Sequence, residues 1–175
     1  PVIAKTARDV LVPLEDYPHA RESTTLAEAV ELLENWQIEF DGSTSMPRIL
    51  LVLDDNNHLL GSVRRRDILR GLEPEFHETL DTLHPEAHFK TEIDPNLTDL
   101  IPAFDPDLLA MKLNRPLREV VRELKGHVDI DDSLMKVVRE LVGEDTHTAA
   151  VLDDDIVVGV VRTLDVLRAV CDPSS

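Results

Sequence analysis

The segment Gly61-Ser62-Val63-Arg64-Arg65-Arg66-Asp67-Ile68-Leu69-Arg70 recurs as Gly159-Val160-Val161-Arg162-Thr163-Leu164-Asp165-Val166-Leu167-Arg168. Six of the ten positions are identical at a constant offset of 98. Just upstream, Leu53-Asp54-Asp55 and Leu152-Asp153-Asp154 each join one apolar run to the next through a short polar turn. The repeat therefore predicts a strand, a turn, a strand and a helix, and predicts this unit twice.

Each copy also predicts an earlier amphipathic helix. Apolar residues spaced at i, i+4 and i+7 align at an offset of 108: Leu26, Val30 and Leu33 with Leu134, Val138 and Leu141. In the first copy, Thr25 and Glu28 have the spacing of a capping box. In the second copy, Asp132 is expected to cap the helix through its carboxylate.

The copies differ in length. Arg8-Asp9-Val10-Leu11 aligns with Arg118-Glu119-Val120-Val121 at an offset of 110, so the first copy carries extra residues, most of them between Trp36 and Pro47. We divide the chain into a first unit at 1–72, a partly helical connector at 73–113 that is interrupted by prolines, and a second unit at 114–175. The expected class is α/β, each unit being a small three-stranded sheet with two helices on one face. Such small units should pack together through their uncovered sheet faces, with pseudo-two-fold symmetry.

Charge and composition exclude several classes of function. The net charge of −17 repels the phosphate backbone, so general nucleic-acid binding is not expected. No apolar run approaches the roughly 18 to 20 residues of a membrane helix, and the first residues lack the pattern of a signal peptide. One cysteine, Cys171, cannot form an internal disulfide, so we expect a cytoplasmic protein that neither spans nor binds a membrane.

The tandem duplication and the repeated ending, Gly61 to Leu69 and Gly159 to Leu167, resemble the cystathionine-β-synthase (CBS) domain, which normally occurs in pairs called Bateman modules. The resemblance covers residues 6–72 and 115–172. It implies a non-catalytic regulatory module that binds AMP, ADP, ATP or S-adenosylmethionine between its units, requires no cofactor and alters a partner protein. The two-fold arrangement of the units also leads us to expect a homodimer.

The same resemblance implies site residues. Asp67 and Asp165 match the aspartate that holds the ribose hydroxyls, although each could instead favour the positive start of its helix. Phosphate would lie beside Arg64, Arg65, Arg162 and Thr163, where Arg64 and Arg162 replace the usual Ser or Thr. The matching adenine positions are His19, Ala20, His127 and Val128, and the two histidines could also be ordinary strand residues.

Other chemistry has weaker support. His77, Asp81, His84 and His88 have the spacing of metal ligands on one helical face, but Pro85 interrupts that helix, so we expect no metal site. No glycine-rich phosphate loop, nucleophile elbow or Cys-x-x-Cys pair is present. Two hypotheses remain: a module that senses an adenosine ligand, or a ligand-free dimerisation and protein-interaction module whose nucleotide pockets have degenerated.

Overall fold

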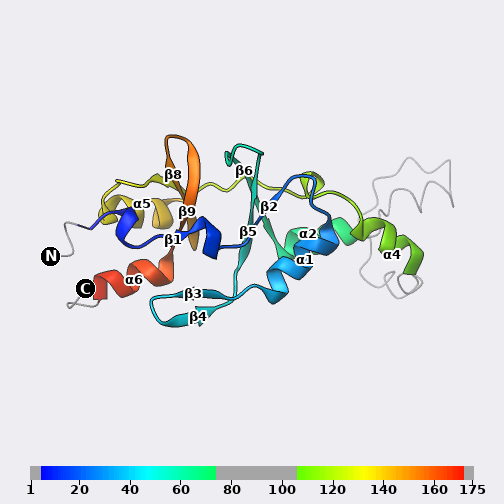
Figure 1. Cartoon of the computed structure of the whole chain (residues 1–175), viewed down its shortest axis with the longest axis horizontal. Helices are drawn as coiled ribbons and strands as arrows, with labels where there is room; N and C mark the ends of the chain where they lie inside the picture. The colour runs from blue at the N-terminus through cyan, green and yellow to red at the C-terminus, as the bar shows by residue number, and fades with distance from the viewer. Residues whose placement is uncertain (1–4, 74–105, 172–175) are drawn as a thin grey trace, which may run out of the picture.

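The computed structural model describes residues 5–73 and 106–171, and Figure 1 shows two units side by side along the long axis. The first unit contains β2 (His19–Arg21), α1 (Leu26–Asn35), β5 (Ile49–Leu53), β6 (Leu59–Arg64) and α2 (Arg65–Leu72). The second unit contains β7 (His127–Asp129), α5 (Leu134–Gly143), β8 (Thr148–Asp153), β9 (Ile156–Arg162) and α6 (Thr163–Cys171). The other elements are η2 (Ala7–Asp9), β1 (Val12–Pro13), η3 (Leu14–Asp16), β3 (Ile38–Phe40), β4 (Ser43–Ser45), α4 (Pro106–Leu113) and η5 (Leu117–Glu119).

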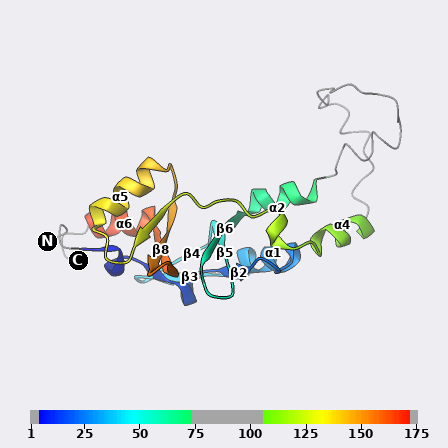
Figure 2. The ribbon, with the colours of Figure 1, turned by 90° about the horizontal axis from the view of Figure 1, so that it is seen from above.

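The two units repeat one topology. In the first unit β2 pairs parallel with β5, and β5 pairs antiparallel with β6. In the second unit β7 pairs parallel with β8, and β8 pairs antiparallel with β9. Figure 2 shows α1 and α2 at one end of the molecule and α5 and α6 at the other, with the strands between them. The predicted α/β class and the tandem pair of similar units are confirmed.

The two faces of the first sheet pack in different hydrophobic clusters. Along β5, Leu50 and Val52 pack with α1 and α2, whereas Leu51 and Leu53 belong to a third cluster that also contains Val160 of the second unit. This alternation follows from the two-residue period of a strand, which sends successive side chains to opposite faces. The third cluster lies between the units, so they pack through the sheet faces that the helices leave uncovered, as expected.

The units exchange their N-terminal segments. Strand β1, near the start of the chain, pairs with β9 of the second unit, with Val12 opposite Val160. Reciprocally, Arg122 pairs with Ser62 of β6 through two backbone hydrogen bonds of 2.8 and 3.0 Å. Because β1 joins the second sheet, that sheet has four strands rather than the three expected from the repeat.

The helix starts agree with the sequence in one copy and differ in the other. Thr25 caps α1 by accepting a hydrogen bond from the Glu28 amide, and the Glu28 carboxylate accepts one from the Thr25 amide, so this capping box is confirmed. In the second copy the cap of α5 is Ser133. Asp132 instead accepts hydrogen bonds from the Asp129 amide and the side chain of Lys136. The capping prediction for Asp132 was therefore wrong by one residue.

The extra residues of the first copy form a β-hairpin, β3–β4. Its two-residue turn is Asp41-Gly42, and both residues have positive φ, at 49° and 72°. Such a turn matches the twist of the paired strands, and glycine adopts it without steric cost. Figure 1 shows the hairpin extending from the first unit toward α6.

Part of the connector lies outside the described residues. Its described end includes the helix α4. The segment that contains His77, Asp81, His84 and His88 lies outside the described residues. Within 5–73 and 106–171, no helix is long and apolar enough to cross a membrane.

Candidate functional site

Two grooves lie between the units, and each contains one copy of the repeated arginine. We call them the Arg64 groove and the Arg162 groove. The first has a volume of about 700 Å³ and the second about 410 Å³. They adjoin, because Arg48, His147 and Thr148 line both.

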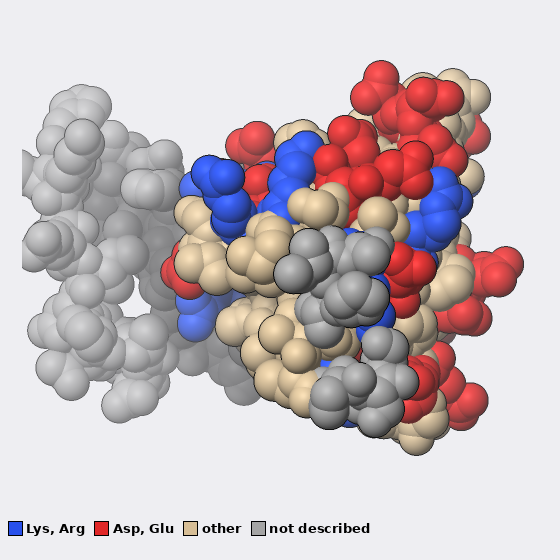
Figure 3. Space-filling model, turned by 90° about the vertical axis from the view of Figure 1, so that its left-hand side faces the viewer, with Lys and Arg blue, Asp and Glu red and all other residues tan. Residues whose placement is uncertain are grey.

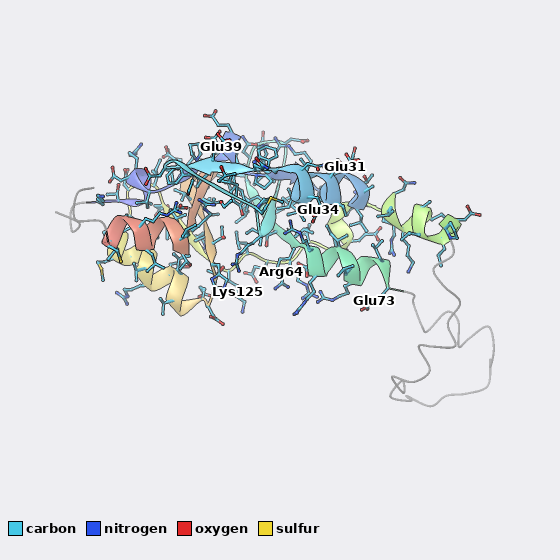
Figure 4. All side chains as sticks on the ribbon, turned by 90° about the horizontal axis from the view of Figure 1, so that it is seen from below. Glu31, Glu34, Glu39, Arg64, Glu73 and Lys125 are labelled. Carbon is cyan, nitrogen blue, oxygen red and sulfur yellow. The ribbon has the colours of Figure 1, made fainter. Side chains whose placement is uncertain are left out.

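The Arg64 groove is a basic region in an acidic chain. Its lining includes three carboxylates, Glu123, Glu144 and Asp145, and six cationic side chains, which are Arg48, Arg64, Arg65, Arg66, Arg122 and Lys125. Figure 4 shows Arg64 and Lys125 close together near the middle of the molecule, where the two units meet. By contrast, Figure 3 shows acidic side chains gathered along the upper part of the end formed by the second unit. The groove is therefore the local cationic site that an anionic ligand would need.

Asp67 lies beneath this groove and is held by three arginines. Its side chain is 1% exposed. It accepts hydrogen bonds from the Arg64 amide at 2.9 Å and from the Arg64 guanidinium at 3.0 and 3.2 Å. Arg70 and Arg122 add ion pairs at 3.3 and 3.1 Å. Asp67 is not among the groove's lining residues, because these side chains cover it.

The balance of these contacts keeps Asp67 ionised. Burial by itself raises the pKa of the Asp67 carboxyl, but the hydrogen bonds from Arg64 and the charges of Arg64 and Arg122 lower it more, so the net pKa lies below its usual value. The backbone position supports this arrangement, since Arg64 ends β6 and Asp67 lies in the first turn of α2. A carboxylate there also interacts favourably with the positive end of the helix dipole.

The Arg162 groove repeats this pair in a more enclosed form. Arg162 donates to Asp165 from Nε at 2.6 Å and from Nη2 at 2.8 Å. The Arg162 side chain is only 11% exposed, whereas that of Arg64 is 50% exposed. Asp165 does not line this groove; it borders a neighbouring hollow together with Phe40 and Asp41 of the hairpin.

The other predicted phosphate contacts line the grooves. Arg65 lies in the Arg64 groove, and Thr163 lies in the Arg162 groove. Arg65 is also bound to the end of α1, where it donates to the Glu34 carboxylate at 2.6 Å and to the Leu33 carbonyl at 2.6 Å.

The predicted adenine contacts lie elsewhere in the fold. Ala20 and Val128 are buried beneath the helices of their own units. His19 is half-buried and lies 2.8 Å from the Tyr17 carbonyl oxygen, and His127 is exposed. None of these four residues lines either groove.

Sequence reasoning missed several groove residues. Arg122 and Lys125 line the Arg64 groove and belong to the exchanged segment that precedes β7. The first copy has no arginine or lysine at the equivalent positions, so the repeat did not point to them. Arg48 comes from the residue before β5. One signal was available for the hairpin, because Asp-Gly between two short extended runs is a strong hairpin pattern.

Comparison with known proteins identifies the fold and matches the first unit to a known domain family. Residues 7–74 match the model of the CBS domain. The match covers the first unit, and the second unit repeats the fold of the first. No curated protein matches the chain.

The solved structures it resembles are also CBS-domain proteins. A CBS domain-containing protein of unknown function from Kribbella flavida is 18% identical, with a TM-score of 0.71 over 97% of this chain and 100% of that one. The CBS-pair protein CBSX2 from Arabidopsis thaliana is 20% identical, with a TM-score of 0.63 over 96% of this chain and 95% of that one. A structure of CBSX2 in complex with AMP is 19% identical, with a TM-score of 0.63 over 97% of this chain and 98% of that one. The whole chain thus has the fold of a CBS pair.

Candidate metal ligands do not gather in the described part of the chain. Residues 5–73 and 106–171 contain no group of three or more His, Cys, Asp or Glu side chains placed to hold a metal ion.

Proposed function

We propose that the chain is a regulatory CBS-pair module that binds an anionic adenosine compound, AMP, ADP or ATP, in the Arg64 groove. The observation that carries this proposal is the excess of six cationic over three acidic side chains in a groove between the units. Guanidinium groups are well suited to phosphate because they donate several hydrogen bonds in a fixed plane. S-adenosylmethionine bears a positive sulfonium and is the weaker candidate.

Ligand entry requires an exchange of partners at Asp67. The Arg64 and Arg122 side chains are 50% and 53% exposed, so both have room to turn from Asp67 toward a phosphate. The carboxylate oxygens that they release would then accept the two ribose hydroxyls. Ile49 and Leu124 line the same groove and offer apolar surface to a purine ring. The adenine contacts at His19, Ala20, His127 and Val128 stay a prediction.

Because the groove is built from both units, the ligand would act on their packing. A ligand shifts the balance between two arrangements only by its difference in affinity for them. We propose that this shift, or a change of oligomeric state, is read by an effector protein in the cytoplasm.

Isothermal titration calorimetry with AMP, ATP and S-adenosylmethionine tests this function. Arg66 and Lys125 are exposed groove residues, so Arg66→Ala and Lys125→Ala should each weaken ATP binding about tenfold, equivalent to about 1.4 kcal/mol. Arg8→Ala is the matched control, since Arg8 is an exposed arginine that pairs with Asp131 outside the groove. Asp67→Ala should abolish ribose binding, with circular dichroism checking its fold. Failure of all three compounds to bind at millimolar concentration would reject the proposal.

A second function, ligand-free association, is favoured by a different observation. Asp67 and Asp165 already have arginine partners, as expected of pockets that no longer bind ribose. The equivalent leucines Leu69 and Leu167 are 65% and 56% exposed, which offers apolar surface for a homodimer. Sedimentation velocity of Leu69→Glu and Leu167→Glu tests this alternative: loss of a dimer without nucleotide binding would support it.

A further inference from the structure

We propose that the two grooves are unequal and that the β3–β4 hairpin closes the Arg162 groove, which leaves one nucleotide site per chain. The number of bound nucleotides rests on the function proposed above. The closure of the Arg162 groove by the hairpin does not depend on any ligand.

The two grooves contain equivalent residues of the two repeated units. A difference between them therefore comes from a segment that only one unit has. Arg64 aligns with Arg162, and the residues that follow, Arg65 and Thr163, line their own grooves in the same way. The asymmetry comes from the segment between the first helix and the next strand of each unit. Between α1 and β5 this segment comprises residues 36–48, whereas between α5 and β8 it comprises only 144–147.

The longer segment forms the hairpin, and the hairpin binds Arg162 in the second groove and Arg168 in the neighbouring hollow. Ser45 Oγ accepts a hydrogen bond from Arg162 Nη1 at 2.7 Å, and Ser43 Oγ accepts one from Arg168 Nη1. Arg162 Nε and Nη2 donate to Asp165, so each of the three guanidinium nitrogens already has a partner. A phosphate entering here would compete with the hydroxyl and the carboxylate for Arg162.

The base of the hairpin is fixed in the core between the units. Ile38 is 1% exposed and belongs to the same apolar cluster as Tyr17 and Val160, and Phe40 packs against that cluster. Removal of these apolar side chains from water holds the segment against the core. The hairpin is therefore anchored over the groove.

The charged side chains that line the two grooves differ more in number than in net charge. The Arg162 groove is lined by two arginines, Arg48 and Arg162, and by no carboxylate, whereas the Arg64 groove has six cationic side chains and three carboxylates. The hairpin also adds two exposed carboxylates, Glu39 and Asp41. Figure 4 shows Glu39 on the opposite edge of the molecule from Arg64 and Lys125. Neither carboxylate lines the Arg162 groove, so the larger number of cationic side chains in the Arg64 groove is what favours an anion in that groove.

The closure is tested without any nucleotide by arginine modification. Phenylglyoxal labelling with peptide mass spectrometry should modify Arg162 at least about tenfold more slowly than Arg64, in line with hydrogen bonds worth about 1.4 kcal/mol. The variant Gly42→Val/Ser45→Ala should bring the two rates close together. Valine disfavours the positive φ of the turn, and a Cβ at position 42 would meet no atom beyond the neighbouring residues within 4 Å, so the Gly42 substitution acts on the backbone of the hairpin. Equal rates in the wild type, or unchanged protection in the variant, would overturn the closure.

Calorimetry with ATP separates this inference from the function on which it rests. One nucleotide per wild-type chain, lost in Lys125→Ala/Arg66→Ala and unaffected by Thr163→Ala, supports the unequal grooves. Two nucleotides per chain, one of them lost in Asp165→Ala, would overturn the inference but leave the proposed function standing. No binding to any variant would reject the function, and the labelling rates would still decide whether the hairpin covers Arg162.

Discussion

Replacing Gly159 with alanine should destabilise the protein strongly, because the exchanged N-terminal segment leaves no room for a methyl group. A Cβ at this position would overlap the Val12 carbonyl oxygen and lie 2.8 Å from Leu11 Cδ1. These neighbours belong to the segment of β1 that pairs with β9. Gly61 is in the same situation in the first unit, where its Cβ would overlap the Arg122 carbonyl oxygen and lie 2.6 Å from Val121 Cγ1.

The loss of stability in Gly159→Ala depends on which atoms the new methyl group displaces. The overlap involves backbone, so β1 must shift and loosen its pairing with Val160. Overpacking of a core costs roughly 1–3 kcal/mol, and a backbone obstacle places this case at the upper end, about 3 kcal/mol. For a chain of this size that corresponds to a fall in Tm of roughly 6–12 °C.

Urea unfolding followed by circular dichroism measures this change. Gly143→Ala is the control, because Gly143 ends α5 and a Cβ there would have no atom within 4 Å. It should be neutral or stabilising by up to about 1 kcal/mol. If Gly159→Ala matches the wild type to within about 0.5 kcal/mol, a size typical of harmless surface substitutions, the first segment does not cross the second sheet at this point.

Two further predictions concern single side chains. Tyr17 is the only tyrosine, and burial raises its pKa to about 12. Its tyrosinate absorbance should therefore titrate near pH 12 in the folded protein and near 10 in denaturant, and a native midpoint near 10 would contradict its burial. The folded state holds the proton more tightly, so stability is complete below pH 10 and falls by about 3 kcal/mol as pH rises to 12. Tyr17→Phe should remove that slope in urea titrations. Thr25→Ala should cost about 1 kcal/mol by removing the cap of α1, measured by the same unfolding; an unchanged midpoint would mean that the Glu28 amide has another partner.

The fold was largely predictable because its signals are local and occur twice. The helices at α1 and α5 follow from apolar spacing, and the strand, turn, strand and helix units follow from the motifs that begin at Gly61 and Gly159. Local signals failed where two neighbouring residues compete for one role. Asp132 and Ser133 can both cap α5, and the backbone geometry selects Ser133. Val30, expected on the apolar face of α1, is exposed, while Ala29 is fully buried.

The candidate site was predictable only in part. The repeat singled out Arg64 and Asp67 for separate ligand contacts, and the structure shows that they bind each other across three residues at the start of a helix. Arg122 reaches Asp67 from a segment 55 residues away, so only the packing of the two units brings them together. No local sequence pattern around Arg122 predicts that contact.

The amino-acid sequence by itself determined the duplicated α/β unit and the start of α1, because each depends on residues a few positions apart. The tertiary structure decided which segment crosses which sheet, which cations gather in one groove, and how the hairpin lies over Arg162. These features arise from contacts between residues distant in the chain, and such contacts are selected by the burial of shared apolar surface rather than by any local pattern.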